Sequence, residues 1–269
     1  MSSKNYKQIF TNKCMINMKR GQVAIYIIAA IVIVALVVLG VSFYPRLGGI
    51  FSQEISPNTY LKNCIEPEIK PAVEILSKQG GYRNPDGLIE YNGKKIKYLC
   101  YTSENYKTCN VQQPMIKSNF EKELNNVIKP KADQCARNLI SEYGKRGFRV
   151  ISSSVSSRVE IVPEKIKVVI SAPMTITKDS TQTFNEFEVN IGSEMYNLLF
   201  TASSIIDYEA SLGDSATELY LQYYPDLKIE KTKLSDGTKI YRLSNVVTNE
   251  EFVFASRSLA WPAGYGLEG

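Results

Sequence analysis

The chain has 269 residues, no histidine, and 32 basic against 27 acidic residues, which gives a net charge of +5. Five of the basic residues precede Gly21 without any acid, so the rest of the chain is electrically neutral and has no basic surface suited to nucleic acid. The lack of histidine excludes imidazole acid–base catalysis, Ser-His and Cys-His nucleophile pairs, and histidine metal sites.

The first element expected along the chain is an apolar helix that runs from Val23 to Tyr44 without a charged residue. At a rise of 1.5 Å per residue, about 20 such residues span roughly 30 Å, the hydrocarbon thickness of a bilayer. The preceding segment carries only basic charges, so the positive-inside rule places the N-terminus in the cytoplasm and everything after Pro45 outside the cell. A secretory signal peptide would have a shorter apolar core. We expect a single-pass protein of the cell membrane, in contact with membrane lipid.

Four residues at the start of this helix, Lys19-Arg20-Gly21-Gln22, resemble the class III (prepilin-type) signal peptide of archaeal type IV pilin-like surface proteins. The resemblance covers about residues 13–44. It implies that a prepilin peptidase recognises Lys19 and Arg20 and cuts between Gly21 and Gln22 on the cytoplasmic side, leaving the apolar helix on the mature protein. Many pilins carry glutamate at the fifth mature position, where this chain has Tyr26. The alternative interpretation is that Lys19 and Arg20 only set the orientation of a permanent membrane anchor.

The cysteine positions agree with this topology. Cys14 lies in the expected cytoplasmic leader, whereas the other four lie outside, where an even number of cysteines is typical of disulfides. Three pairings are possible; we favour Cys64–Cys135, which would tie two helices together, and Cys100–Cys109, which would close a short loop. A four-cysteine zinc site is the competing interpretation, and the absence of any C-x-x-C spacing argues against it.

The outer part of the chain begins with a mainly helical region that contains these four cysteines. Ser56-Pro57 is a typical helix start, and Gly80-Gly81 are expected to end this helix. Asn92-Gly93 predicts the turn of a β-hairpin between residues 88–91 and 96–101. Ser118 and Glu121 have the spacing of a capping box, which would open a second long helix that ends at Gly144. The apolar faces of the two helices are expected to pack together.

The remaining outer residues are expected to form mainly antiparallel strands. Between residues 148 and 191 apolar residues alternate in three strands, with turns at 163–165 and 178–180, which predicts a meander. An apolar helical face from Met195 to Leu212 is expected to cover that meander. A short helical turn follows at 219–224, then a hairpin around Asp236-Gly237 and a last strand at 250–255. The predicted fold class is α+β, with helices packed on an antiparallel sheet.

These elements divide the chain into six segments. In order, they are a basic cytoplasmic leader (1–21), a transmembrane or pilin-type helix (22–44), a juxtamembrane hinge (45–56), a helical half with the disulfides (57–147), a half of antiparallel strands with one helix (148–263), and a loose tail (264–269). An outer part of about 220 residues is large enough to bury a sizeable hydrophobic core.

The outer part shows no motif that indicates catalysis. The G-x-S-x-G, G-x-G-x-x-G and P-loop patterns are absent. Closely spaced acids could serve a carboxylate-based surface enzyme, but such pairs are typical of solvated faces; they are Glu66 and Glu68, Asp207 and Glu209, and Glu250 and Glu251. Lys228, Lys231 and Lys233 could bind acidic surface polymers, but we prefer to interpret them as lysines that protect an edge strand from pairing. We expect no catalytic residue, no cofactor and no metal.

The sequence therefore predicts a membrane-anchored extracellular surface protein that is not an enzyme. As a pilin-like subunit, it would bind copies of itself through the helix from Val23 to Tyr44, and its outer domain would be structural or adhesive. The alternative is a binding module of the cell envelope that stays permanently anchored and does not polymerise. Neither interpretation involves nucleic acid.

Overall fold

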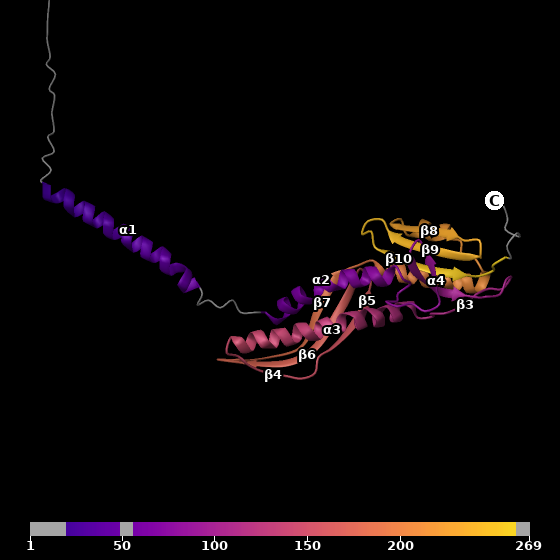
Figure 1. Ribbon diagram of the computed structural model, residues 1–269, viewed down its shortest axis with the longest axis horizontal. Coiled ribbons are helices and arrows are strands. Elements are labelled where there is room, and N and C mark those ends of the chain that lie inside the picture. The colour runs from indigo at the N-terminus through magenta and orange to yellow at the C-terminus, as the bar shows by residue number, and fades with distance from the viewer. Residues whose placement is uncertain (1–19, 49–55, 262–269) are drawn as a thin grey trace, which may run out of the picture. The chain divides into compact units, whose positions relative to one another are not determined.

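The computed structural model describes residues 20–48 and 56–261, and the chain divides into two compact units, residues 1–54 and 55–269. Figure 1 labels most of the helices and strands. The expected leader up to residue 19, residues 49–55 of the expected hinge and the expected tail at 264–269 lie outside the described residues.

The described part of the first unit is the helix α1 (Arg20–Gly48). It begins at the second residue of the basic pair and continues through Pro45, so it is longer than the predicted apolar segment. Side chains are described for residues 25–39, and all of them are exposed, as Ile27 and Leu36 illustrate. Judged by the residues whose placement is described, no helix is long and apolar enough to cross a membrane.

Two long helices open the second unit, α2 (Pro57–Ser77) and α3 (Ile116–Lys145). They pack against each other through apolar faces, as predicted, and the disulfide Cys64–Cys135 joins them with a Cα–Cα distance of 6.1 Å. We call this disulfide the helix bridge. It is one of the two pairings favoured from the sequence. Pro67 and Pro71 lie inside α2 without dividing it.

The predicted capping box at the start of α3 is wrong. The helix begins at Ile116, so Ser118 lies within its first turn, and no side chain caps it. The carboxylate of Glu121 instead accepts hydrogen bonds from the backbone N–H of Ile161, at 2.7 Å, and from Lys117 Nζ, at 2.6 Å. A tertiary bond to the neighbouring strand has replaced the local one, and Glu121 ties α3 to the sheet.

The predicted meander is present, but its sheet has four antiparallel strands where the sequence predicted three. Its strands are β4 (Arg149–Ser152), β5 (Ser156–Val162), β6 (Lys165–Thr177) and β7 (Thr181–Gly192). Strand β6 pairs with all three others. The alternation predicted from the sequence is present, with Val159 opposite Val168 and Ile161 opposite Ile166. We call this sheet the meander sheet; α3 packs on β5 and α2 packs beside β7.

The second sheet has six strands and is mixed, which the sequence did not predict. Its strands are β1 (Leu88–Tyr91), β2 (Lys94–Tyr101), β3 (Asn110–Val111), β8 (Leu227–Lys233), β9 (Thr238–Asn245) and β10 (Glu251–Arg257). Strand β10 lies between β9 and β2 and runs parallel to β2, with Ala255 opposite Tyr98. The disulfide Cys100–Cys109, here called the strand bridge, holds the loop between β2 and β3. This pairing was also favoured from the sequence.

Both hairpin turns expected in this mixed sheet are present. Asn92 and Gly93 have φ angles of 50° and 73°, the left-handed pair that suits a tight turn between β1 and β2. Gly237, with φ 85°, turns the chain between β8 and β9. Strand β8 pairs only with β9 within the described sheet, so its lysines lie on an edge strand, as predicted.

Helix α4 (Met195–Leu212) ends at Gly213, whose φ of 81° is usual after a helix C-terminus. Its buried face packs chiefly on β10, whereas the sequence predicted a place on the meander. Phe252 and Phe254 on β10 are fully buried, and the helix packs against this strand. Leu212, assigned to the apolar face, is 64% exposed at the end of the helix.

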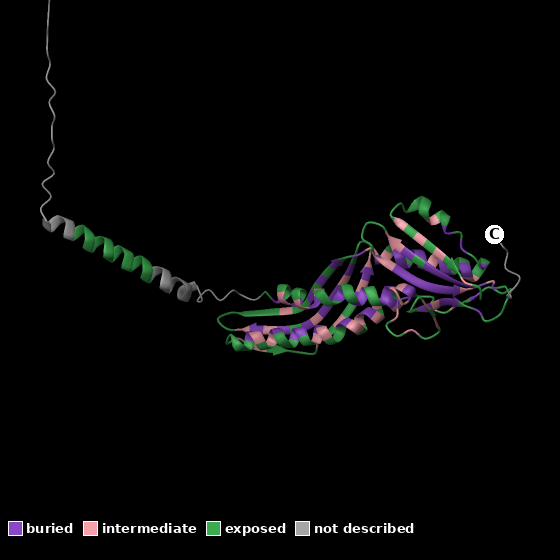
Figure 2. Cartoon of the chain, turned by 45° about the horizontal axis from the view of Figure 1, so that its top comes forward, coloured by how far each residue is buried: buried purple, intermediate pink, exposed green. Residues whose placement is uncertain are grey.

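One continuous core joins α2, α3, α4 and both sheets. In Figure 2 the buried residues run along the strands of both sheets, whereas the described side chains of α1 are exposed. The short helix α5 (Glu218–Tyr223) has no buried residue and leads into β8. The α+β class predicted from the sequence is confirmed, with one antiparallel and one mixed sheet.

Candidate functional site

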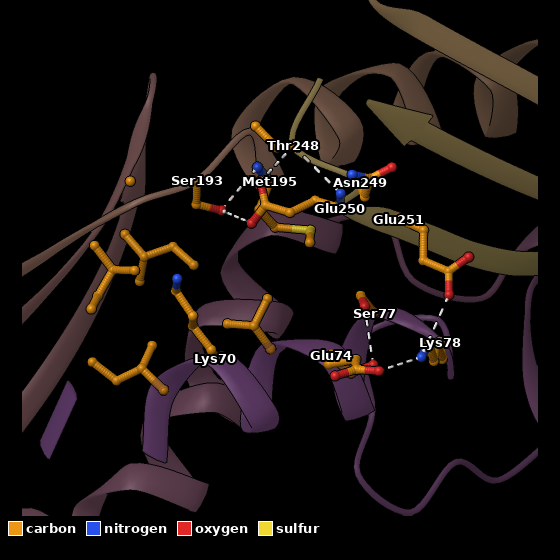
Figure 3. Close-up of a pocket in the computed structure, with 15 residues that line it drawn as sticks. Lys70, Glu74, Ser77, Lys78, Ser193, Met195, Thr248, Asn249, Glu250 and Glu251 are labelled. Carbon is orange, nitrogen blue, oxygen red and sulfur yellow. Dashed lines mark hydrogen bonds and ion pairs between the residues drawn. The ribbon is translucent and has the colours of Figure 1, made fainter. Parts of the chain in front are cut away.

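A cavity of about 420 Å³ lies where α2 meets the ends of both sheets. Its walls come from α2, β6, β7, the link from β7 to α4, and the loop between β9 and β10 (Figure 3). We call it the junction cavity. Its volume is within the range of about 300–1,000 Å³ that is usual for small-molecule sites. Its apolar wall consists of Ile69, Val73, Ile166, Ile191 and Met195.

The polar end of the junction cavity is organised around Glu250. One carboxylate oxygen accepts a hydrogen bond from the Ser193 hydroxyl at 2.7 Å, and the other accepts bonds from the Glu194 N–H at 2.5 Å and the Thr248 hydroxyl at 3.4 Å. Asn249, at φ 60°, adopts the left-handed conformation that asparagine tolerates in turns. Because the carboxylate lies at the N-terminal end of α4, the helix dipole favours its negative charge.

Ser193 is a hydrogen-bond relay within this end of the cavity. Its hydroxyl donates to Glu250 and accepts from the backbone N–H of Met195 at 3.2 Å. The hydroxyl proton is therefore hydrogen-bonded to a carboxylate that already accepts bonds from two other donors. No basic side chain in the described part of the chain bonds to the serine oxygen. This geometry suits ligand binding and does not prepare a nucleophile.

The wall formed by the end of α2 carries paired charges. Lys78 Nζ lies 2.5 Å from Glu74 and 3.7 Å from Glu251, and Glu251 in turn lies 3.7 Å from Arg242. The hydrogen bond from Lys78 lowers the pKa of Glu74, and the same bond raises the pKa of Lys78. These charges neutralise one another and fix the side of the cavity.

Lys70 lies about two helical turns before Lys78 on α2 and differs from it. Its side chain is exposed, and it makes no hydrogen bond or ion pair with any described residue. In Figure 3 its amino group points from α2 toward the side of the cavity where Ser193 and Glu250 lie. Glu250 likewise has hydrogen bonds only from uncharged groups. The cavity thus holds one uncompensated cation and one uncompensated anion.

A buried polar cluster lies elsewhere, between α4 and the mixed sheet. Glu209 is 0% exposed, so the prediction that Asp207 and Glu209 form a solvated pair is wrong for Glu209. Its carboxylate accepts hydrogen bonds from Lys239 Nζ at 2.8 and 3.1 Å, from the Tyr241 hydroxyl at 2.5 Å and from the Ser256 hydroxyl at 2.9 Å. Burial, and then the negative charge of Glu209, raise the pKa of Tyr241 above its ordinary value.

Asp214 lies at the more open end of this cluster and bonds the ammonium groups of Lys231, Lys233 and Lys239. Burial raises the pKa of Asp214, but the three lysines outweigh this effect and hold it below its ordinary value. Because the bonding groups of Glu209, Lys239 and Tyr241 are all used within the fold, we assign the cluster to stability, which leaves the junction cavity as the candidate site.

The structure keeps most residues singled out in the sequence apart from one another. Arg20, Gly21 and Gln22 form the first turn of α1, and Lys19 lies outside the described residues. Glu66 and Glu68 are on α2, where Glu68 pairs with Lys131 at 3.2 Å. Of the three acid pairs singled out in the sequence, Glu250 and Glu251 are the one that lines the junction cavity. In the described part of the chain, no group of histidine, cysteine, aspartate or glutamate residues is arranged to hold a metal ion.

Sequence reasoning missed Lys70, Ser193 and the buried role of Glu209. Glu209 follows Ile205 by four residues, so it belongs to the apolar face of α4, and this spacing was a usable signal. No comparable sequence signal identifies Lys70 or Ser193, because the cavity that they line is formed by segments far apart in the sequence.

Comparison with protein-family models, with curated proteins and with solved structures finds no match to this chain. The chemistry of the residues must therefore carry any assignment. The junction cavity combines an apolar wall, a fixed carboxylate and a free ammonium group, which is an arrangement for recognising a small polar molecule.

Proposed function

We propose that the chain is a membrane-anchored surface protein, pilin-like at its N-terminus, whose residues 55–269 form a non-catalytic extracellular domain. The observation that carries the proposal is the apolar run from Val23 to Tyr44, directly after a leader that contains basic residues and no acid. The run lies within α1, whose described side chains are exposed in the isolated chain. An apolar surface of this size needs lipid or protein to cover it.

The disulfides support an extracellular position for the second unit. Both the helix bridge and the strand bridge lie in that unit. Such bridges persist in oxidising compartments and are rare in the cytosol, where thiols are kept reduced. A domain on the outer side of the membrane, tied by two disulfides, agrees with a cytoplasmic N-terminus rich in basic residues.

The first test is the N-terminus of the protein recovered from membranes of cells that contain a prepilin peptidase. If the peptidase recognises Lys19 and Arg20, mass spectrometry will find a chain that begins at Gln22. Gly21→Arg should abolish this cleavage, because it removes the residue after which the peptidase cuts. A wild-type chain that still begins near Met1 in these cells would exclude the pilin-type leader and leave a permanent anchor.

A permanently anchored binding module is the second candidate, and Tyr26 at the position where many pilins carry glutamate favours it. Filament assembly distinguishes the two. Ala35→Asp places a charge in the middle of the apolar run, where assembly would bury it without a partner. The same charge raises the free energy of membrane insertion by about 3 kcal/mol, which an otherwise apolar helix tolerates in part.

For a pilin-like subunit, the Ala35→Asp protein should remain partly recoverable from membranes, while filaments containing it disappear from the fraction sheared off the cells. The membrane fraction is the control for insertion. If the wild-type protein never appears in sheared filaments and leaves the membrane only with detergent, polymerisation is refuted and the protein is an anchored surface domain.

A further inference from the structure

The charges that line the junction cavity fall into two groups. Glu74, Lys78 and Glu251 form a connected set of ion pairs on one wall. Lys70 and Glu250 line the same cavity and belong to no ion pair among the described residues. The cavity therefore presents one positive and one negative group that are both available to a ligand.

Glu250 is held in place by hydrogen bonds and not by an ion pair. Its three hydrogen-bond donors, from Ser193, Glu194 and Thr248, are all uncharged. A carboxylate offers about four acceptor positions, so one position remains for a donor that comes from the cavity. Because the residue is half-buried, a charged donor there makes a stronger bond than it would in water.

Lys70 supplies the complementary charge. It projects from α2 beside the apolar side chains of Ile69 and Val73, and its amino group points toward the side of the cavity that holds Glu250. No described acid neutralises it. A ligand that reaches from Glu250 to Lys70 must carry an ammonium group at one end and a carboxylate at the other, with an apolar part toward the cavity wall.

We propose that the junction cavity binds a zwitterion with an aliphatic side chain, that is, a free amino acid or a short peptide of this type. The ammonium group of the ligand bonds Glu250, its carboxylate bonds Lys70, and its side chain lies on the apolar wall, of which Val73 and Ile191 are the most accessible members. The cavity volume of about 420 Å³ accommodates a molecule of this size. This binding is independent of membrane anchoring and of filament assembly.

The test is a titration of the full chain in detergent micelles, followed by NMR of labelled isoleucine and methionine methyl groups. The probes are L-leucine, the dipeptide Leu-Leu, and two analogues of leucine with one charge each, 4-methylpentanoate and 3-methylbutylamine. The methyl signals of Ile191 and Met195 should shift with leucine or with the dipeptide, and the tighter of the two identifies the ligand length. Each analogue should bind at least about tenfold more weakly, because one charge-assisted bond is missing.

Variants separate the proposed contacts from general effects. Lys70→Gln and Glu250→Gln should each weaken binding of the zwitterion at least about tenfold. Lys62→Gln, on the same helix but outside the cavity, is the matched control and should bind as the wild type does. Lys70→Glu should reverse the selectivity toward 3-methylbutylamine. Because Lys70 is exposed, its variants keep the fold even if Glu250→Gln loosens the start of α4.

Three results would overturn the proposal. The first is the absence of methyl shifts at Ile191 and Met195 with both zwitterions at millimolar concentration. The second is binding of either analogue as tight as that of leucine, which would show that the charge missing from that analogue does not contribute to binding. The third is an equal loss of affinity in Lys62→Gln and Lys70→Gln, which would remove Lys70 from the contact.

Discussion

Replacing Lys239 with methionine tests whether its buried ion pair with Glu209 stabilises the second unit. Methionine keeps most of the apolar stem and removes the ammonium group that bonds both oxygens of Glu209, at 2.8 and 3.1 Å. The carboxylate then retains hydrogen bonds only from uncharged groups, namely the hydroxyls of Tyr241 and Ser256 and the backbone N–H of Ser215.

The size of the effect follows from burial. The side chains of Glu209 and Lys239 are 0% and 8% exposed, so water has little room to replace the lost partner. Removing one member of such a pair lowers the free energy of unfolding by about 3–5 kcal/mol. Lys231→Met is the matched control, because Lys231 pairs with Asp214, whose side chain is 46% exposed and can be hydrated. Its loss should be about 1 kcal/mol or less.

The assay is urea unfolding of the full chain in a mild detergent, with both disulfides intact, followed by near-ultraviolet circular dichroism. For an m-value of about 2 kcal/mol/M, the Lys239→Met midpoint should fall about 1–2 M below that of Lys231→Met. Equal midpoints for the two variants would refute the reasoning, since burial of the partner carboxylate would then have no bearing on the loss.

Three further predictions use the same unfolding assay. Changing both cysteines of the helix bridge to alanine removes a bond between residues 71 positions apart and should lower the unfolding free energy by about 4 kcal/mol. The same change in the strand bridge, whose cysteines are 9 positions apart, should lower it by about 2.5 kcal/mol. The reverse order would contradict a chain-entropy origin. Gly237→Ala should lower the unfolding free energy more than Gly93→Ala. Both glycines have positive φ, but only the Cβ added at position 237 would meet another atom closely, the Ala260 Cβ at 2.3 Å. Similar losses of unfolding free energy in the two variants would show that this contact relaxes freely. Because the pKa of Tyr241 is raised in the fold, the protonated hydroxyl contributes to the unfolding free energy fully below about pH 10, and this contribution is lost as the pH rises above that value. Tyr241→Phe should therefore reduce the slope with which the unfolding free energy falls at alkaline pH. An unchanged slope would exclude this residue as its source.

Local signals in the sequence were sufficient for much of the fold. Asn92-Gly93 predicted a hairpin because few other residue pairs accept positive φ at both positions, and the structure has both angles positive. Cys64 and Cys135 lie on helices that each need a partner for an apolar face, which made their pairing the natural one, and the structure contains it. Each of these inferences depends on residues that are neighbours in the chain or on a helix face.

Features set by distant segments were not predicted. The parallel pairing of β2 and β10 could not be predicted locally, because the sequence of neither strand indicates which strand it pairs with or in which register. The capping box failed because Glu121 bonds the N–H of Ile161, a choice that only the packing of α3 on β5 decides. The junction cavity has the same origin, since Lys70 and Glu250 come from opposite ends of the second unit.

The position of β10 also fixes when the second unit can finish folding during synthesis. Without β10, the mixed sheet is two separate parts, β1–β2–β3 and β8–β9, each with an open edge. At about 5–20 residues per second, the strand that joins them leaves the ribosome roughly 8–30 s after β2. The open edge of β2 must therefore be kept from pairing with other chains over that interval, and a chain that stops before β10 cannot close the sheet.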